Sequence, residues 1–157
     1  MMSYMALKLV HIISSTLLFG TGLGTAFYMW RADRSRNLTV IAAVSRHVVI
    51  ADWLFTAPAV IVQPVTGLAM LHLAQIPLTT PWVIASLVLY GVTGLCWLPV
   101  VYLQIQVCRN ARRLLQNSEE LNAAHDHYMR RWYILGWPAF ISVLLIFYLM
   151  VFKPAFG

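Results

Sequence analysis

The sequence predicts an all-α protein, an integral membrane bundle of four helices. Of its 157 residues, 61% are hydrophobic and only 10% are charged, whereas soluble domains contain about 45–50% apolar and about 25% charged residues. The apolar residues fall in four segments separated by polar stretches, and each segment is long enough to cross the roughly 30 Å hydrocarbon core of a bilayer. Because four such spans use nearly the whole chain, we expect one transmembrane domain over residues 1–157.

The predicted spans cover about residues 4–30, 47–73, 82–108 and 132–152. The first is too long for the apolar core of a signal peptide and is followed by arginines, so we expect it to be retained. Prolines interrupt the other three spans, and neighbouring helices or side chains must satisfy the backbone carbonyl groups that these prolines free. The prolines are Pro58, Pro64, Pro99 and Pro138.

The distribution of basic residues predicts the topology. Nine of the eleven basic residues are arginines, and they cluster in the first and third polar stretches, whereas the middle stretch has no charge. By the positive-inside rule, the arginine-rich stretches face the cytoplasm, and the middle stretch and both termini lie on the outer side of a bacterial inner membrane. The same clustering explains the net charge of +6, so we expect lipid and no nucleic acid as a partner.

The third polar stretch, residues 109–131, is long enough to contain structure of its own. It predicts an extension of the third helix, a turn at Asn117 and Ser118, and an entry helix to the fourth span with Ser118 as its N-cap. His125 and His127 lie in the sequence HDHYMRR. Their spacing would suit a metal ion, but we expect both histidines to lie in a solvated loop.

Of the five histidines, only His11 lies clearly inside a span, about 10 Å from its outer end. An ionisable side chain inside a bilayer is costly and is by default a functional hypothesis. A neutral imidazole that projects into a helical bundle is also a ligand that haem iron accepts. We therefore expect His11 to be the metal ligand of a haem b; a packing hydrogen bond and a proton relay are the alternatives.

The second span carries polar and small residues along one helical face. They are Asp52, Thr56, Ala59, Gln63 and Gly67. Gln63 and Thr66 should reach the depth of His11 from the facing helix, and Gln63 is the expected hydrogen-bond partner of its ring. Asp52 lies nearer the inner surface, where we expect an ion pair with Arg46 or a later arginine, and a proton acceptor is the alternative.

The second axial ligand of such a haem stays open. His72 is predicted to be shallower than His11 and on the opposite face of its helix, and His47 lies at the other membrane surface. Met70, a water molecule and an open position are the alternatives. Lys8 precedes His11 by one helical turn, where it can meet a haem propionate or extend to lipid head groups.

Small residues predict close helix packing. Gly20 and Gly24 form a small-xxx-small pair in the first span, and Gly67 and Gly94 lie in the second and third. The third span also carries a stripe of aromatic and small residues that we expect to pack in the core: Tyr90, Gly94, Trp97 and Val101.

The segments LKLVHIIS, PAVIVQPVTGLAM and LYGVTGLCWLPVVYLQIQ together resemble a bacterial family of predicted four-helix integral membrane proteins of unassigned function. More distantly, the K-x-x-H-I opening at Lys8–Ile12 and the arginine-flanked second span are similar to HemJ-type protoporphyrinogen oxidases and the CopD membrane domain. The HemJ-type resemblance implies haem binding by His11. That family also has a lysine shortly after a tryptophan near the start of span three, whereas Trp82 is followed here by VIAS, and no Met or His array suited to copper lies on one face.

The sequence thus predicts a haem-binding, redox-type inner-membrane protein, with Gln63 and Thr66 near the ligand His11. Such a protein would act as an oxidoreductase on a quinone or a porphyrin within the bilayer. A hypothesis of another class is a cofactor-free small membrane subunit that packs through its glycines in a homo-oligomer or a larger complex.

Overall fold

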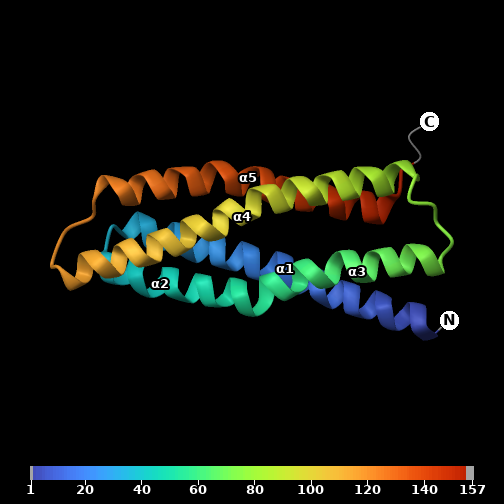
Figure 1. The fold of residues 1–157 in the computed structure, drawn as a ribbon, viewed down its shortest axis with the longest axis horizontal. Coiled ribbons are helices and arrows are strands. Elements are labelled where there is room, and N and C mark those ends of the chain that lie inside the picture. The colour runs from blue at the N-terminus through green and yellow to red at the C-terminus, as the bar shows by residue number, and fades with distance from the viewer. Residues whose placement is uncertain (1, 155–157) are drawn as a thin grey trace.

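The structure is a computed structural model that describes residues 2–154, and it forms an elongated bundle of helices (Figure 1). In chain order these are α1 (Met2–Ser35), α2 (Leu38–Ala51), the π-helical η1 (Asp52–Thr56), α3 (Ala57–Leu73), α4 (Pro81–Gln116) and α5 (Ala123–Phe152). The segments α2, η1 and α3 run on as one helix, so the described chain has four helices long and apolar enough to cross a membrane. The predicted all-α four-helix membrane bundle is confirmed.

The helices extend beyond the predicted spans at their arginine-rich ends. Only Arg36 and Asn37 separate α1 from α2, because the alanines and arginines of this stretch favour helix. Arg36 has a positive φ of 51°, which reverses the chain. The Asn37 side chain then accepts hydrogen bonds from the backbone N–H groups of Thr39 and Val40 and caps α2.

The turn after α4 forms where the sequence predicted it, but its predicted cap is wrong. Ser118 has a positive φ of 55°, whereas an N-cap residue needs extended backbone angles. Asn122 has those angles, and its side chain accepts the backbone N–H of His125 at 3.1 Å, so Asn122 begins α5. The Asn122 side-chain oxygen also accepts a hydrogen bond from the side-chain amide of Asn110 at 3.0 Å, which joins α4 to the start of α5.

The main core lies in the half of the bundle that carries the arginine-rich ends. Its buried residues come from α1, α2, α4 and α5: Met29, Ala32, Ile41, Ala42, Val48, Val100, Leu103, Val107, Ala111, Met129 and Trp132. In the other half, α3 packs against α1, α4 packs against α5, and a smaller cluster of Trp82, Val83 and Leu149 holds the second pair. The two helix pairs therefore approach each other less closely in the half that holds both termini (Figure 1).

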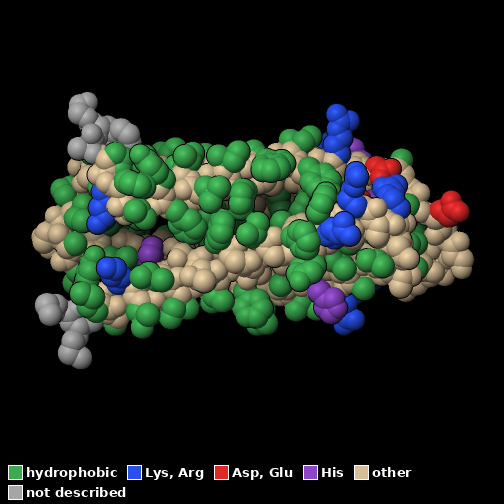
Figure 2. All heavy atoms as spheres, turned by 180° about the vertical axis from the view of Figure 1, so that it is seen from behind, with side chains coloured by type: hydrophobic (Ala, Val, Ile, Leu, Met, Phe, Trp, Pro, Cys, Tyr) green, Lys and Arg blue, Asp and Glu red, His purple; other side chains and the backbone are tan. Residues whose placement is uncertain are grey.

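The surface is that of a lipid-facing protein. Hydrophobic side chains cover the middle of the molecule, and charged side chains gather toward its two ends (Figure 2). Many large apolar side chains are exposed, Leu95 and Val151 at 74% each. Such a surface fits a hydrocarbon environment rather than water.

We predict that the α4–α5 turn faces the cytoplasm and the α3–α4 loop faces the outside. The measurement labels single cysteines with a membrane-impermeant maleimide in intact cells, in a background with Cys96→Ser and Cys108→Ser. Thr79→Cys, in the α3–α4 loop, should be labelled, and Glu120→Cys should be labelled only after the cells are opened. The reverse pattern would contradict the topology.

Candidate functional site between α1 and α3

His11 is held against α3 by its ring. Its Nδ1 atom lies 2.8 Å from the hydroxyl oxygen of Thr66, and the Thr66 hydroxyl in turn donates to the carbonyl of Val62 at 2.6 Å. When the Thr66 proton is directed at that carbonyl, the Thr66 oxygen can accept an N–H from Nδ1. This arrangement favours the Nδ1–H tautomer, in which Nε2 keeps its lone pair.

Gln63 joins the same junction through the backbone of α1. Its side-chain amide donates to the His11 carbonyl at 2.8 Å and to the Ser14 hydroxyl at 2.5 Å. The prediction that the Gln63 side chain bonds the ring is therefore wrong, because Thr66, almost one turn farther along α3, places its short side chain beside the imidazole. Both Gln63 and Thr66 do lie at the depth of His11, as the sequence predicted.

Gly67 provides the close approach that the ring needs. A Cβ atom built on Gly67 would lie 3.4 Å from Cε1 of His11, so the imidazole packs on bare backbone. The other glycines singled out by the sequence do not pack in this way. A Cβ at Gly20, Gly24 or Gly94 would meet no atom within 4 Å.

The other candidate ligands take no part in the hydrogen bonds of this junction. His72 is exposed near the end of α3, His47 is exposed on α2, and Met70 is half-buried. Lys8 is exposed one turn from His11 toward the N-terminus. Within residues 2–154, no group of three or more His, Cys, Asp and Glu side chains could hold a metal ion.

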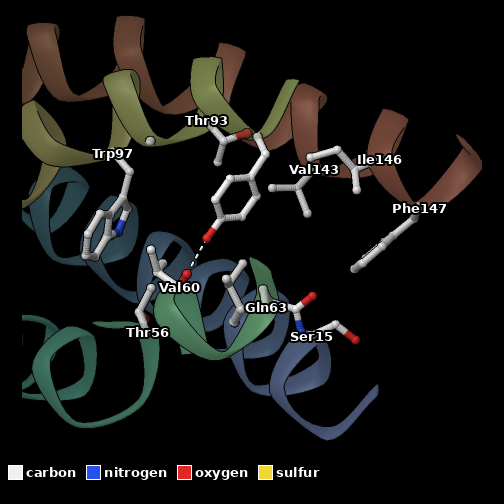
Figure 3. A pocket seen from close by; sticks show the side chains of 12 residues that line it. Ser15, Thr56, Val60, Gln63, Thr93, Trp97, Val143, Ile146 and Phe147 are labelled. Atoms are coloured by element: carbon white, nitrogen blue, oxygen red, sulfur yellow. Dashed lines mark hydrogen bonds between the residues drawn. The ribbon is translucent and has the colours of Figure 1, made fainter. Parts of the chain in front are cut away.

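A cavity of about 80 Å³ lies between the two helix pairs, next to this junction (Figure 3). Its walls are mostly apolar, with Ser15 and Leu18 from α1, Thr56, Val60 and Gln63 from η1 and α3, Tyr90, Thr93, Gly94 and Trp97 from α4, and Val143, Ile146 and Phe147 from α5. The stripe of Tyr90, Gly94 and Trp97, expected to pack in the core, lines this cavity instead.

Tyr90 closes one side of the cavity by a hydrogen bond to the carbonyl of Val60, the dashed line in Figure 3. Pro64 has no N–H to donate to Val60, which lies four residues earlier in the helix. The Tyr90 hydroxyl supplies the missing donor from another helix, as a proline inside a membrane span requires.

A second polar cluster, at the arginine-rich end, was missed by the sequence. Asp33 of α1 accepts hydrogen bonds from the Tyr133 hydroxyl and from Nε2 of His125, each at 2.9 Å. The prediction that His125 lies in a solvated loop is wrong, since it is fully buried in the first turn of α5, whereas His127 is exposed. The only sequence signal was an aspartate isolated among arginines.

A model of the family described as "Predicted integral membrane protein (DUF2269)" matches residues 5–154. The chain belongs to this family. No curated protein matches the chain, and no solved structure matches it. The match confirms the resemblance to a membrane family of unassigned function.

We predict that Thr66 determines the tautomer of His11. In protein labelled with ¹⁵N-histidine, the His11 signal, assigned by its loss in His11→Gln, should show a protonated Nδ1. Thr66→Ser keeps the hydroxyl and should preserve this state, whereas Thr66→Val should shift the ring toward the Nε2–H tautomer. An Nε2–H tautomer in the parent protein, or no change in Thr66→Val, would show that another group sets the proton.

Proposed function

We propose that the protein is a haem-binding, redox-type protein of the bacterial inner membrane, with His11 as an axial ligand of a haem b. The observation that supports this function is the hydrogen-bond chain from His11 through Thr66 to Val62. A histidine that binds a metal through one ring nitrogen commonly donates the N–H of its other ring nitrogen to a neighbouring oxygen. This hydrogen bond fixes the orientation of the ring and raises the basicity of the ligand. Here Thr66 occupies that position and Nε2 is left to bind iron.

The residues around His11 are suited to hold a haem. Gln63 holds the α1 backbone at His11 and the Ser14 hydroxyl, and Thr66 bonds the ring itself. These two residues of α3 together set the direction of the ring. Lys8, exposed one turn outside His11, provides a cation for a carboxylate of the macrocycle at the membrane surface. The K-x-x-H-I likeness to HemJ-type proteins supports the same role for His11.

The space for a macrocycle must come from movement of the helix pairs. The cavity of about 80 Å³ is smaller than ordinary ligand pockets, which measure about 300–1,000 Å³. The α1–α3 and α4–α5 pairs are joined near it by the Tyr90–Val60 hydrogen bond and by contacts of Phe19 with Phe140 and Phe147. Opening this side would leave the main core at the other end intact.

A bound haem would supply one-electron chemistry, and the chain would supply ligation, burial and access to a partner. The lipid-exposed surface and the apolar walls of the cavity favour a partner that dissolves in the bilayer. We therefore propose a quinone or a porphyrin as the redox partner, and an oxidoreductase as the class of activity.

The first prediction from this function concerns the absorption spectrum. Protein purified after expression with ample haem should show a Soret band, and reduction with dithionite should sharpen its α and β bands. His11→Ala should remove these bands while its far-ultraviolet circular dichroism still reports a helical fold. His72→Ala is the matched control and should keep them. A featureless spectrum of the parent protein, or bands retained in His11→Ala, would rule out this site.

A second candidate function is a cofactor-free subunit that packs against another copy or a larger membrane complex. It is favoured by the empty space beside Gly20 and Gly24 on α1, because small residues usually mark helix faces that approach another helix closely. In the described chain these faces have no such neighbour.

This second function predicts an oligomer that depends on α1. Gly20→Leu and Gly24→Leu should lower the oligomeric state in mild detergent, measured by cross-linking and native mass spectrometry. Gly136→Leu is the matched control, because Gly136 on α5 also has open space beside it. A monomer in the parent protein, or equal effects of all three variants, would argue against a specific α1 interface.

A further inference from the structure

A carboxyl group lies buried in the bundle, far from the junction at His11. Asp52 is the first residue of η1 and is only 4% exposed. It follows the exposed Arg46 by six residues in one continuous helix, which places it about 9 Å deeper along the helix axis. An ionisable side chain at such a depth is costly unless its charge is compensated or removed.

The hydrogen-bonding contacts of Asp52 are neutral. The hydroxyl of Thr56, itself 4% exposed, donates to Oδ1 of Asp52 at 3.0 Å. The side chain of Gln104 reaches the same carboxyl from α4 and is 3% exposed. No ion pair involves Asp52 anywhere in residues 2–154, so the predicted pair with Arg46 is wrong.

The titratable groups on the neighbouring helices do not replace that missing cation. On α2, Arg46 and His47 are exposed, and on α1 the side chain of Tyr28 is 63% exposed. On α4, Cys108 is buried one turn beyond Gln104, and Tyr90 bonds Val60. Between η1 and the exposed His72, α3 has no titratable side chain.

Gln104, which contacts Asp52 from α4, has an unpaired atom of its own. The Oε1 atom of Gln104 is buried and has no hydrogen-bond donor, and an unpaired buried acceptor is destabilising. The Gln104 contact with Asp52 is donation from its amide N–H to the carboxyl. With Thr56, this gives Asp52 two neutral donors and no cation, so one proton removes the buried charge while both donors can still bond the carboxyl.

We propose that Asp52 is an intramembrane proton-binding site, protonated at neutral pH, and that Thr56 connects it to the cavity between the helix pairs. Thr56 also lines that cavity, and a volume of about 80 Å³ has room for water molecules, each of which needs about 10–15 Å³. During loading, the Thr56 oxygen takes a proton from a hydronium ion that reaches the cavity from bulk water, and Thr56 passes its own hydroxyl proton to the Asp52 carboxylate, which leaves a neutral water molecule, a neutral hydroxyl and a neutral carboxyl. Release is the reverse transfer.

The π-helix η1 begins at Asp52 and ends at Thr56, so both residues of the proposed site lie in its widened turn. The Ala57 N–H bonds the Asp52 carbonyl, five residues back, so the helix widens at the buried carboxyl. Such widened turns occur often at functional sites. This proposal does not depend on haem at His11, and each can fail without the other.

The test is infrared spectroscopy of the full chain in lipid nanodiscs, labelled with ¹³C at the aspartate carboxyl. Of the three aspartates, Asp33 and Asp126 pair with His125 and Arg36, so Asp52 should give the protonated carboxylic acid band at neutral pH. The band should disappear in Asp52→Asn and persist in Asp126→Asn. Absence of the band in the parent protein, or its persistence in Asp52→Asn, would overturn the proposal.

Variants of Thr56 keep the test decisive if Asp52→Asn does not fold. Thr56→Val removes a hydrogen bond to the carboxyl, so the C=O band should move to higher frequency and exchange more slowly after transfer to D₂O. Thr56→Ser keeps the hydroxyl and should match the parent protein. A band whose frequency and exchange rate do not change in Thr56→Val would overturn both the assignment to Asp52 and the route through Thr56.

Discussion

The structure depends on the requirement that polar groups inside a bilayer be satisfied by the protein itself. In hydrocarbon no water is present to pair with a free carbonyl, hydroxyl or imidazole nitrogen. The carbonyl of Val60, freed by Pro64, therefore takes its donor from Tyr90 on another helix. The amide of Gln63 serves the His11 carbonyl and Ser14 on α1 in the same way. These contacts fix how α3 sits against α1 and α4, and so they position both the His11 ring and the cavity.

The two halves of the bundle meet this requirement differently. At the arginine-rich end, α1, α2, α4 and α5 share one core, and Asp33 links α1 to α5 through His125 and Tyr133. Toward the termini the chain forms two helix pairs with a cavity between them. A bundle that is closed at one end and paired at the other can change the spacing of its pairs without losing its core. The proposed binding of a lipophilic ring would use that asymmetry.

The architecture could be predicted because it follows from composition and periodicity. Four apolar segments, their lengths and the arginine clusters all report on a bilayer. The polar face of the second span was also predictable, since Asp52, Thr56 and Ala59 recur at helical intervals and are all buried. The pairing of side chains between helices could not be predicted from the sequence. Whether Thr66 or Gln63 reaches the His11 ring depends on helix rotation and side-chain length, which spacing within one helix does not determine.

The same reasoning explains why Asp52 and His125 were misplaced by the sequence. An aspartate near arginines suggests an ion pair, but Asp52 points into the bundle while Arg46 is exposed to the surroundings. A histidine in a charged stretch suggests a solvated loop, but helix α5 begins early enough to bury His125 against Asp33. Both errors come from judging a side chain by its neighbours in the sequence, whereas each of the two has a partner on another helix.

The cavity gives a physical reason to consider the two proposed sites together. Gln63, which bonds the backbone at His11, and Thr56, which bonds Asp52, both line it. They lie seven residues apart on one continuous helix, or about 10 Å along its axis. If the proposed haem is held by His11, an electron on it would place charge in a medium of low dielectric, where compensation by a proton is strongly favoured. Under the second proposal, a neutral Asp52 joined to the cavity through Thr56 would be a proton store within that reach, so the two proposed sites would be linked through residues of one cavity wall.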